Sequence, residues 1–391
     1  MKDITRIKHL KERFVKHFGH ECSNIFLSPG RIELLGNHTD HNNGKVLVSS
    51  VNLKILAAVA PRNDNKIVIF SKGYKKIQVS LNALKKREKE YGKSIAIVRG
   101  VTARFKKLGY KIGGFSVCCD SSIYNGAGVS SSAAFECLVG KILSYYYNED
   151  SIPAFTIAQI AQFSESVYFN KPCGLLDQSG IALGGINYID FKSTKAPIIE
   201  NLKIVNKKYQ FIIINTGDNH SKLTPCYAAI KDEMKLIANH FGKQVLRQIK
   251  PSLVLDNKEE LIKLYGERAF LRAKHYFEEN ERVATAYNAL HEGNFELFLK
   301  MLDDSGTSSY YQLQNCYVSN EEEKLTKALK LVKEIDPECY SRVHGGGFAG
   351  TMLMVINRAK SKTVVNELRK AFGYENVMLV SLTSEGTCVK E

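Results

Sequence analysis

The chain has 391 residues, 44% of them hydrophobic, and a formal net charge of +15. Such a composition is typical of a globular protein with roughly two to three domains or lobes. No apolar run approaches the roughly 18 residues of a membrane helix, and the opening segment MKDITRIKHLKERF lacks the apolar stretch of a secretion signal. We therefore expect a cytoplasmic protein that does not contact the membrane.

The nine cysteines are scattered from Cys22 to Cys388 without a C-x-x-C pair. This pattern favours a reducing compartment over a disulfide framework or a cysteine-ligated metal. The basic residues are spread along the whole chain, and runs such as residues 82–93 mix bases with acids and lack interleaved aromatic residues. We therefore expect no nucleic-acid partner, although a positive field would favour the approach of an anionic nucleotide.

The first half of the chain mixes helical and β-type patterns. Apolar spacing predicts a helix over residues 3–19, strands near 24–28, 46–60, 66–71 and 76–81, a helix near 95–108 and a strand at 114–119. Two long helical patterns follow, one starting in the serine run near residue 132 and one over 154–169.

In the second half, strands are predicted near residues 186–191 and 209–215, and helical periodicity dominates from 224 to about 333. The closing unit is a triple-glycine loop at 345–347, a strand at 351–356, a helix near 360–371 and a strand at 377–381. Neither an internal repeat nor an obvious flexible linker interrupts this order, so the sequence predicts an α+β protein whose lobes pack tightly together.

Residues 125–134, NGAGVSSSAA, form the strongest chemical motif, between a predicted strand and a predicted helix. Glycines let the backbone approach an anion, and free amides at a helix start and serine hydroxyls can donate to phosphate oxygens. The motif fits neither the P-loop pattern nor the dinucleotide-binding pattern. On spacing alone, a flexible glycine turn capped by serine is the alternative.

Three further segments are rich in functional groups. Residues 342–350, RVHGGGFAG, could close around a ligand or form only a tight turn. Residues 37–42, NHTDHN, offer the donors and acceptors that a polyhydroxylated ligand needs, whereas adjacent side chains on an extended loop suit zinc poorly. In residues 171–178, KPCGLLDQ, Asp177 is either a candidate proton acceptor or an ordinary capping aspartate.

In this order, the four segments resemble those of the GHMP small-molecule kinases, and more narrowly the galactokinase family. The family signature G-R-[VI]-N-[LI]-[IL]-G-E-H-T-D-Y-N-x-G is largely matched by residues 30–44, and its phosphate loop P-x-G-x-G-L-S-S-S-A by residues 124–133. The acid motif C-G-[IL]-[ML]-D-Q corresponds to residues 173–178, and the third glycine motif to residues 344–350. Weaker similarities include Tyr227 and RAKHYFEENER at 272–282.

This resemblance implies a two-lobed GHMP kinase fold with the active site in the cleft between an N-terminal lobe, residues 1–205, and a C-terminal lobe, residues 206–391. It also implies ATP and Mg²⁺ as cosubstrate and cofactor, and transfer of a phosphoryl group to the anomeric C1 hydroxyl of galactose. The implied partners are the sugar and ATP alone, and we expect a monomer.

By matching position, the resemblance implies that Asp177 is the catalytic base and Arg31 its cationic partner. The triphosphate would be held by Gly126, Gly128, Ser130, Ser131 and Ser132, with Ser131 near Mg²⁺. The sugar would be bound by Asn37, His38, Asp40, Gly174 and Tyr227. An arginine beside the acid would keep it ionised and stabilise charge on the transferring phosphoryl group.

Three departures from the family pattern concern the identity of the sugar. Glu33 replaces the usual asparagine, Asn37 the usual glutamate, and His41 the usual tyrosine. The alternatives are therefore a 1-kinase for a galacturonate-type, 6-deoxy, pentose or amino sugar, or an inactive galactokinase-like sugar sensor. The complete serine–alanine stretch, together with Arg31 and Asp177, favours an active kinase over the sensor.

Overall fold

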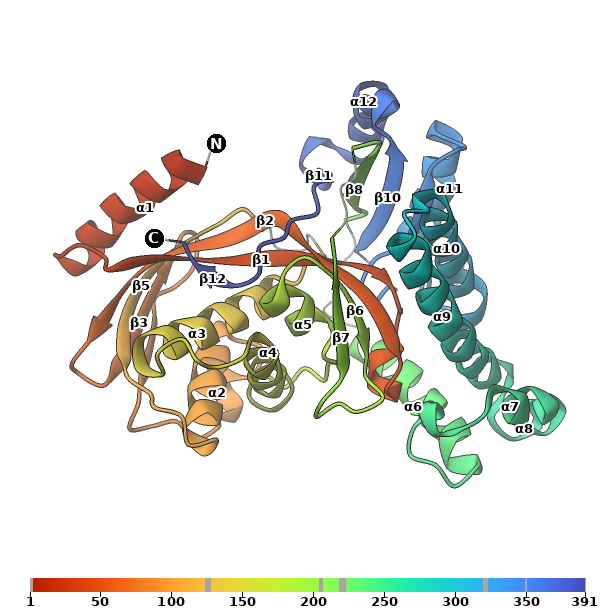
Figure 1. The fold of residues 1–391 in the computed structure, drawn as a ribbon, viewed down its shortest axis with the longest axis horizontal. Coiled ribbons are helices and arrows are strands. Elements are labelled where there is room, and N and C mark those ends of the chain that lie inside the picture. Colours follow the sequence, from red (N-terminus) through yellow and green to blue (C-terminus); the bar gives the residue numbers. More distant parts are fainter. Residues whose placement is uncertain are drawn as a thin grey trace.

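The computed structural model describes residues 3–123, 128–203, 207–217, 223–318, 323–348 and 350–390. Within these residues the chain forms two β-sheets with helices packed against them (Figure 1). The larger sheet has eight strands and the smaller has four. Among the described residues, no helix is long and apolar enough to span a membrane.

The larger sheet is built around two long neighbouring strands. Its order is β12-β1-β2-β5-β3-β4, and β6 pairs with β2 and with β7. The pairs are antiparallel except for β3 with β5. The strands are β1 (Asn24–Leu35), β2 (Lys45–Arg62), β3 (Lys66–Ser71), β4 (Ile77–Ser80), β5 (Gly114–Ser121), β6 (Ile186–Asp190), β7 (Ile198–Leu202) and β12 (Cys388–Val389).

Helices cover both faces of this sheet (Figure 1). On one face lie α2 (Ser94–Lys107), α3 (Ser131–Tyr147), α4 (Ala154–Phe163) and α5 (Leu176–Leu183), and on the other lies α1 (Asp3–Phe18). Because side chains alternate along a strand, Phe26 joins the core on the α2–α5 side, whereas Ile25 and Leu27 pack with Leu10 and Phe14 of α1.

The smaller sheet has the order β11-β8-β10-β9. Its strands are β8 (Tyr209–Asn215), β9 (Tyr340–Val343), β10 (Thr351–Asn357) and β11 (Val377–Val380). One face packs on α11 (Lys324–Ile335) and α12 (Ser361–Phe372), and includes Ile212 and Ile214. The intervening residues Phe211 and Ile213 belong to the same hydrophobic core as the larger sheet, so the two lobes are packed together, as predicted.

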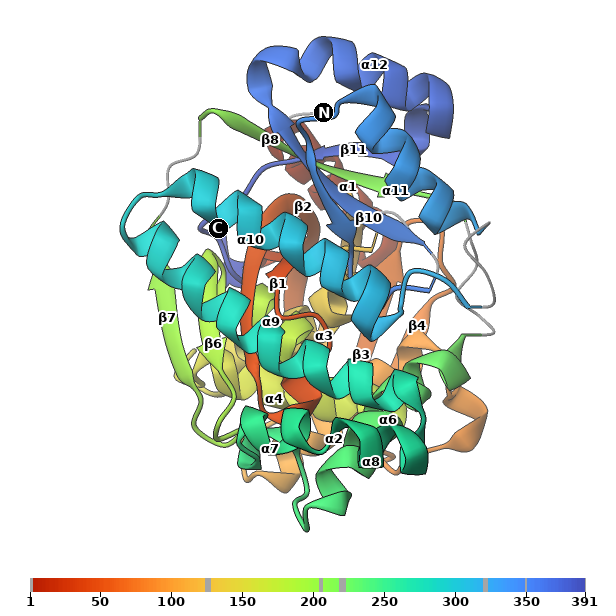
Figure 2. The same cartoon turned by 90° about the vertical axis from the view of Figure 1, so that its right-hand side faces the viewer.

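Besides α11, the helices between β8 and β9 are α6 (Thr224–His240), α7 (Pro251–Asp256), α8 (Lys258–Tyr265), α9 (Glu267–His291) and α10 (Phe295–Ser308). In Figure 2, α9 and α10 pass in front of β1 and β2. Through α9 and α10, helices from the second half of the chain contact β1 of the larger sheet.

The predicted α+β class is confirmed, with several local differences. Strand β1 continues seven residues beyond the predicted end at Ser28, because Pro29 and Gly30 are accommodated at a register shift in its pairing with β2. The helix expected over 154–169 changes at Ser164 into a π-helical turn, Ser164–Tyr168. Helix α5 and strands β7, β9 and β12 were not predicted. The predicted boundary between the two lobes, after residue 205, stays a prediction. Strand β12, near the end of the chain, pairs with β1 of the larger sheet.

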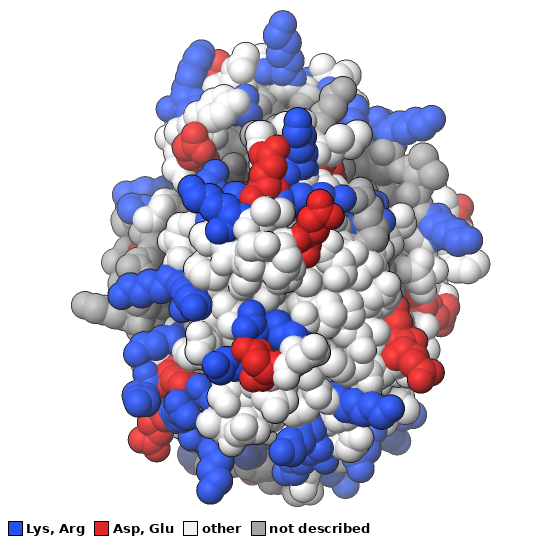
Figure 3. All heavy atoms as spheres, turned by 90° about the vertical axis from the view of Figure 1, so that its left-hand side faces the viewer, with Lys and Arg blue, Asp and Glu red and all other residues white. Residues whose placement is uncertain are grey.

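Positive charge is dispersed over the face drawn in Figure 3. Lysine and arginine side chains alternate there with acidic ones and with uncharged surface. The view therefore shows no continuous basic surface of the kind that follows a nucleic-acid backbone.

Candidate functional site

Two residues far apart in the sequence, Arg31 and Asp177, form an ion pair. Arg31 lies in the middle of β1 and is 4% exposed, and Asp177 is the second residue of α5. The Arg31 Nε atom donates to Asp177 Oδ1 at 2.8 Å. Burial alone would raise the pKa of Asp177, but the Arg31 charge and hydrogen bonds from Arg31 and Ser130 outweigh it and lower that pKa. The carboxylate is therefore ionised at neutral pH, and its side chain remains 31% exposed.

The end of the phosphate-loop motif lies directly against this pair. Ser130 Oγ donates to Asp177 Oδ2 at 2.5 Å, and Arg31 donates through Nη1 to the Gly128 carbonyl at 2.7 Å. Ser130 has φ of 59°, a left-handed conformation that is uncommon for serine and occurs often at functional sites. The structure thus brings the acid, the arginine and the serine run together; Gly126 lies outside the described residues.

Helix α3 begins immediately after Ser130. The side chain of its N-cap residue, Ser130, does not cap the first backbone amides, and such amides, aligned with the helix dipole, bind anions. Gly128 has φ of 70°, and a Cβ there would lie 2.1 Å from Thr351 Oγ1, so only glycine fits between the two motifs. Ser131, the first residue of α3, is half-buried.

A carboxylate that the sequence did not single out, Glu165, lies next to the start of α3. Ser132 Oγ donates to Glu165 Oε1 at 3.1 Å, and Lys171 Nζ donates to the same oxygen at 3.0 Å. Gln178 Nε2 donates to Glu165 Oε2 at 2.6 Å and to Glu136 Oε2 at 3.1 Å. Glu165 is 1% exposed and lies in the π-helical turn Ser164–Tyr168. It follows the buried Ala161 by four residues, so an acid at helical spacing on the apolar face was the signal that could have identified it.

This cluster could take part in holding Mg²⁺. A carboxylate and a hydroxyl are oxygen ligands of the kind that Mg²⁺ prefers, and this ion is usually bound by one or two carboxylates together with substrate phosphates and water. The described residues contain no group of three or more His, Cys, Asp or Glu side chains that would hold a metal alone. Glu136 keeps one buried carboxyl oxygen without a hydrogen-bond partner, and burial together with the neighbouring Glu165 charge raises its pKa.

The predicted sugar-binding acid, Asp40, lies beside Gly174. A Cβ at residue 174 would lie 1.7 Å from Asp40 Oδ2, so the absence of a side chain admits the carboxylate. Asp40 Oδ2 also accepts a hydrogen bond from the Leu176 amide at 3.2 Å. Burial raises the pKa of Asp40, although hydrogen bonds from backbone amides oppose this effect.

Two other predicted sugar residues contact the triple-glycine loop. His38 donates through Nε2 to the Gly346 carbonyl at 3.0 Å, and the Tyr227 hydroxyl donates to the Gly347 carbonyl at 3.0 Å. Burial lowers the pKa of His38 to about 4, so its imidazole is neutral at pH 7. The signature loop, through His38, and helix α6, through Tyr227, therefore both contact the third glycine motif.

Asn37 is placed differently from its predicted neighbours. It is 1% exposed, and its Nδ2 group donates to Glu33 Oε1 and to the Gly345 carbonyl, each at 2.8 Å. Its Oδ1 atom accepts from Asn315 Nδ2 at 2.8 Å. Protein groups thus occupy both donors and the acceptor of this amide, and a direct contact between Asn37 and a sugar stays a prediction.

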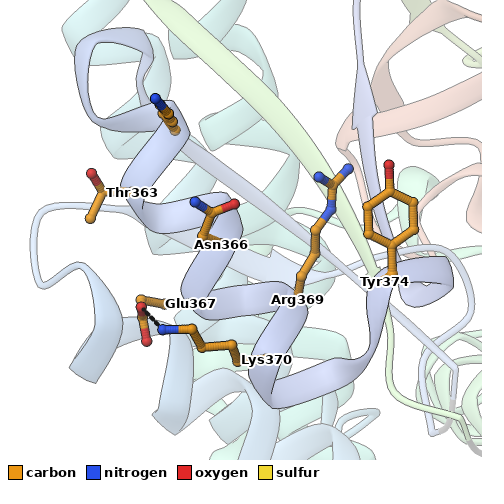
Figure 4. A pocket seen from close by; sticks show the side chains of 7 residues that line it. Thr363, Asn366, Glu367, Arg369, Lys370 and Tyr374 are labelled. Carbon is orange, nitrogen blue, oxygen red and sulfur yellow. Dashed lines mark hydrogen bonds and ion pairs between the residues drawn. The ribbon is translucent and has the colours of Figure 1, made fainter.

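A separate surface hollow lies on α12 (Figure 4). Its lining includes Lys362, Arg369 and Lys370, and the Arg369 guanidinium lies 4.0 Å from the centre of the Tyr374 ring. None of the predicted site residues lines it.

Known proteins resemble this chain in sequence and in fold. A model of the galactokinase galactose-binding signature matches residues 12–61, and one of the GHMP kinases N terminal domain matches residues 96–185. Galactokinase of Clostridium tetani is 28% identical over 387 residues, which are 97% of each chain. The crystal structure of Lactococcus lactis galactokinase complexed with galactose has a TM-score of 0.84 at 24% identity, covering 98% of this chain and 99% of that one. A mevalonate kinase structure has a TM-score of 0.62 at 17% identity, covering 93% and 100%.

The chain therefore has the two-lobed GHMP kinase fold. Within that class, the galactose-binding signature and the near full-length relatives confirm the predicted resemblance to the galactokinase family.

Proposed function

We propose that this chain is an ATP-dependent galactokinase that phosphorylates the C1 hydroxyl of galactose. The observation that carries the proposal is the 2.5 Å hydrogen bond from Ser130 of the phosphate loop to Asp177, which also pairs with Arg31. A phosphate bound at the start of α3 would lie within reach of a hydroxyl held by Asp177. The galactokinase signature and the family's near full-length relatives agree with this assignment.

Each of these groups has a distinct task in the proposed reaction. Asp177, ionised beside Arg31, accepts the proton of the C1 hydroxyl or orients that hydroxyl for attack. Arg31 and the amides of α3 stabilise the negative charge that spreads over the transferring phosphoryl group. Gly128, Ser130, Ser131 and Ser132 line the phosphate site.

We propose that Mg²⁺ is held by Glu165 together with a hydroxyl of the serine run. Ser132 already contacts Glu165, whereas the resemblance points to Ser131. When bound, Mg²⁺ neutralises phosphate charge and orients the phosphoryl group for transfer. Lys171 pairs with Glu165, and that neighbouring carboxylate raises the lysine's pKa, so Lys171 is a second cation beside the phosphate site.

The sugar would be bound by Asp40, His38, Gly174 and Tyr227, next to Asp177. The case for another sugar relied partly on Asn37, but that amide is already hydrogen-bonded by the protein. Galactose therefore remains the preferred substrate over the galacturonate-type, 6-deoxy, pentose and amino sugars. We further propose that the protein acts as a monomer in the cytoplasm, where its nine free cysteines would stay reduced.

The test is a screen for ADP release by the purified protein with ATP and Mg²⁺. Galactose, galacturonic acid, fucose, arabinose and galactosamine would be compared at equal concentrations, and galactose is expected to give the highest kcat/KM. Faster turnover of another sugar would overturn the substrate assignment. Galactose binding without turnover of any sugar would instead favour the sensor.

A further inference from the structure

A carboxylate of α9, that of Glu279, accepts hydrogen bonds from the turn that carries the proposed sugar residues. Glu279 is fully buried. Its Oε1 atom accepts hydrogen bonds from the backbone amides of Gly36, at 2.8 Å, and Asn37, at 3.4 Å. These two residues directly precede His38, so the contact is made to the start of the sugar loop and comes from a helix more than 240 residues away in sequence.

The charge of Glu279 is fully compensated inside the protein. Arg282 Nε donates to Glu279 Oε2 at 2.7 Å, and Ser305 Oγ donates to Oε1 at 2.5 Å. Burial alone would raise the pKa of Glu279, but the charge of Arg282 and these hydrogen bonds lower it to about 2. Glu279 is therefore ionised at neutral pH, and hydrogen bonds to an ionised acceptor are roughly twice as strong as neutral ones.

One turn earlier on α9, His275 holds the other side of the same peptide segment. Its Nε2 atom donates to the Asn37 carbonyl at 3.0 Å, and its Nδ1 atom contacts Ser308 Oγ at 2.8 Å. Ser308 Oγ accepts in turn from Arg282 Nη2 at 2.8 Å. Both the amide and the carbonyl of Asn37 are therefore fixed by side chains of α9.

The segment that they hold has an unusual backbone. Gly36 has φ of 97°, and a Cβ there would lie 2.6 Å from the Lys45 carbonyl. His38 has φ of 58°, a left-handed conformation. Such conformations are costly and persist only where surrounding contacts hold them. The contacts from α9 therefore stabilise the backbone conformation of residues 36–38.

We propose that Glu279 and His275 are positioning residues, which fix the backbone at residues 36–38 so that His38 and Asp40 face the sugar. This inference rests on the proposed sugar-kinase function. It gives a role to the segment RAKHYFEENER, in which the buried side chains of His275 and Glu279 contact the sugar loop. Loss of the Glu279 charge should therefore weaken sugar binding more than ATP binding.

The first test compares Glu279→Gln with Glu281→Gln, a charge-matched control at an exposed position of the same helix. Glutamine has nearly the same shape, but its amide group places a donor against either Arg282 Nε or the Gly36 amide. We expect KM for galactose to rise about tenfold, with less than a twofold change for ATP. Equal changes in both KM values, or an unchanged galactose KM in a folded variant, would overturn the proposal.

Should Glu279→Gln not fold, Ser305→Ala provides a milder variant that keeps the carboxylate. It is expected to raise the galactose KM two- to threefold and to leave the ATP KM unchanged. An unchanged galactose KM in Ser305→Ala would also overturn the proposal.

A second test does not depend on turnover. Hydrogen–deuterium exchange of the peptide spanning residues 34–42 should be at least about fivefold faster in Glu279→Gln than in the wild type and unchanged in Glu281→Gln. Unchanged exchange in a protein that phosphorylates galactose would refute the positioning role alone. Faster exchange in a protein that phosphorylates no sugar would refute the proposed function and leave the contact intact.

Discussion

Asp40 Oδ2 accepts a hydrogen bond from the backbone amide of Leu176 at 3.2 Å. Leu176 is the first residue of α5, and Asp177 is the second. The acid of the sugar loop therefore caps the helix that presents the proposed catalytic acid. A shift of either group would be transmitted to the other, which links sugar binding to the position of Asp177.

The first prediction concerns Asp177 itself. Asp177→Ala removes the carboxylate that contacts both Arg31 and Ser130, so we expect kcat to fall about 10²- to 10⁴-fold. Near-UV circular dichroism and ATP binding should remain close to those of the wild type. Turnover within a few-fold of the wild type would show that another group accepts or orients the proton.

A second prediction follows from the contact between Gly174 and Asp40. A Cβ at position 174 would overlap Asp40 Oδ2 at 1.7 Å, so Gly174→Ala must displace the carboxylate. We expect at least about a tenfold rise in the galactose KM, a smaller change in the ATP KM, and destabilisation of about 1–3 kcal/mol. Initial rates at varied sugar and varied ATP give the two constants. An unaltered galactose KM would exclude Asp40 from sugar binding.

A third prediction concerns Glu33 and Asn37, two residues that differ from the family pattern, and holds that they act together. Glu33 receives hydrogen bonds from Asn37 and from Arg342, whose side chain is fully buried. Glu33→Asn leaves Arg342 without its carboxylate and should cost about 3–5 kcal/mol of unfolding free energy. Asn37→Glu adds a second carboxylate beside the first and should also destabilise.

The exchanged double variant Glu33→Asn/Asn37→Glu retains one carboxylate and one amide in contact. We expect it to be at least about 1–2 kcal/mol more stable than the sum of the two single changes implies. Urea unfolding of the wild type, the two single variants and the double variant gives the double-mutant cycle that measures this coupling. Strictly additive effects would show that the two positions are not coupled.

The fourth prediction concerns Mg²⁺. Glu165→Gln removes the carboxylate charge beside Ser132 and should raise the Mg²⁺ concentration for half-maximal activity at least about tenfold, since even outer-shell partners of a metal typically contribute that much. Calorimetric titration of Mg·ATP gives a second readout. Unchanged binding and unchanged Mg²⁺ dependence would place the metal elsewhere.

The fifth prediction concerns pH. Burial lowers the pKa of His275 from 6.5 to about 4, so the folded protein keeps this imidazole neutral while the unfolded chain takes up a proton. Its contribution to stability is present above pH 6.5 and is lost as the pH falls toward 4. Between pH 8 and 5, this single group should lower the unfolding free energy by about 2 kcal/mol. Urea unfolding at several pH values should show a shallower decline in His275→Gln; an identical slope in both proteins would contradict the assignment.

Much of the local structure could be predicted from the sequence. Strands β3 and β8 lie at their predicted bounds, and α1 and α2 lie within one residue of theirs, because alternating and helical apolar spacing directly reports which face is buried. The chemistry of the motifs pointed to Asp177 and the serine run, and the family resemblance pointed to Arg31; the structure brings the three into contact. The unpredicted α5 was hidden by its short length and by the surrounding glycines.

The features that could not be predicted from the sequence depend on contacts between distant parts of the chain. Periodicity predicted a helix through Glu165, but it could not show that this buried carboxylate contacts Ser132 and Gln178. In the same way, nothing in its own loop reveals that Asn37 is enclosed by Glu33, Asn315 and the triple-glycine loop. The sequence alone determined the functional groups and their order, because these are encoded locally. The tertiary structure decided which groups are buried, paired and charged, since burial and pairing exist only once segments hundreds of residues apart have packed together.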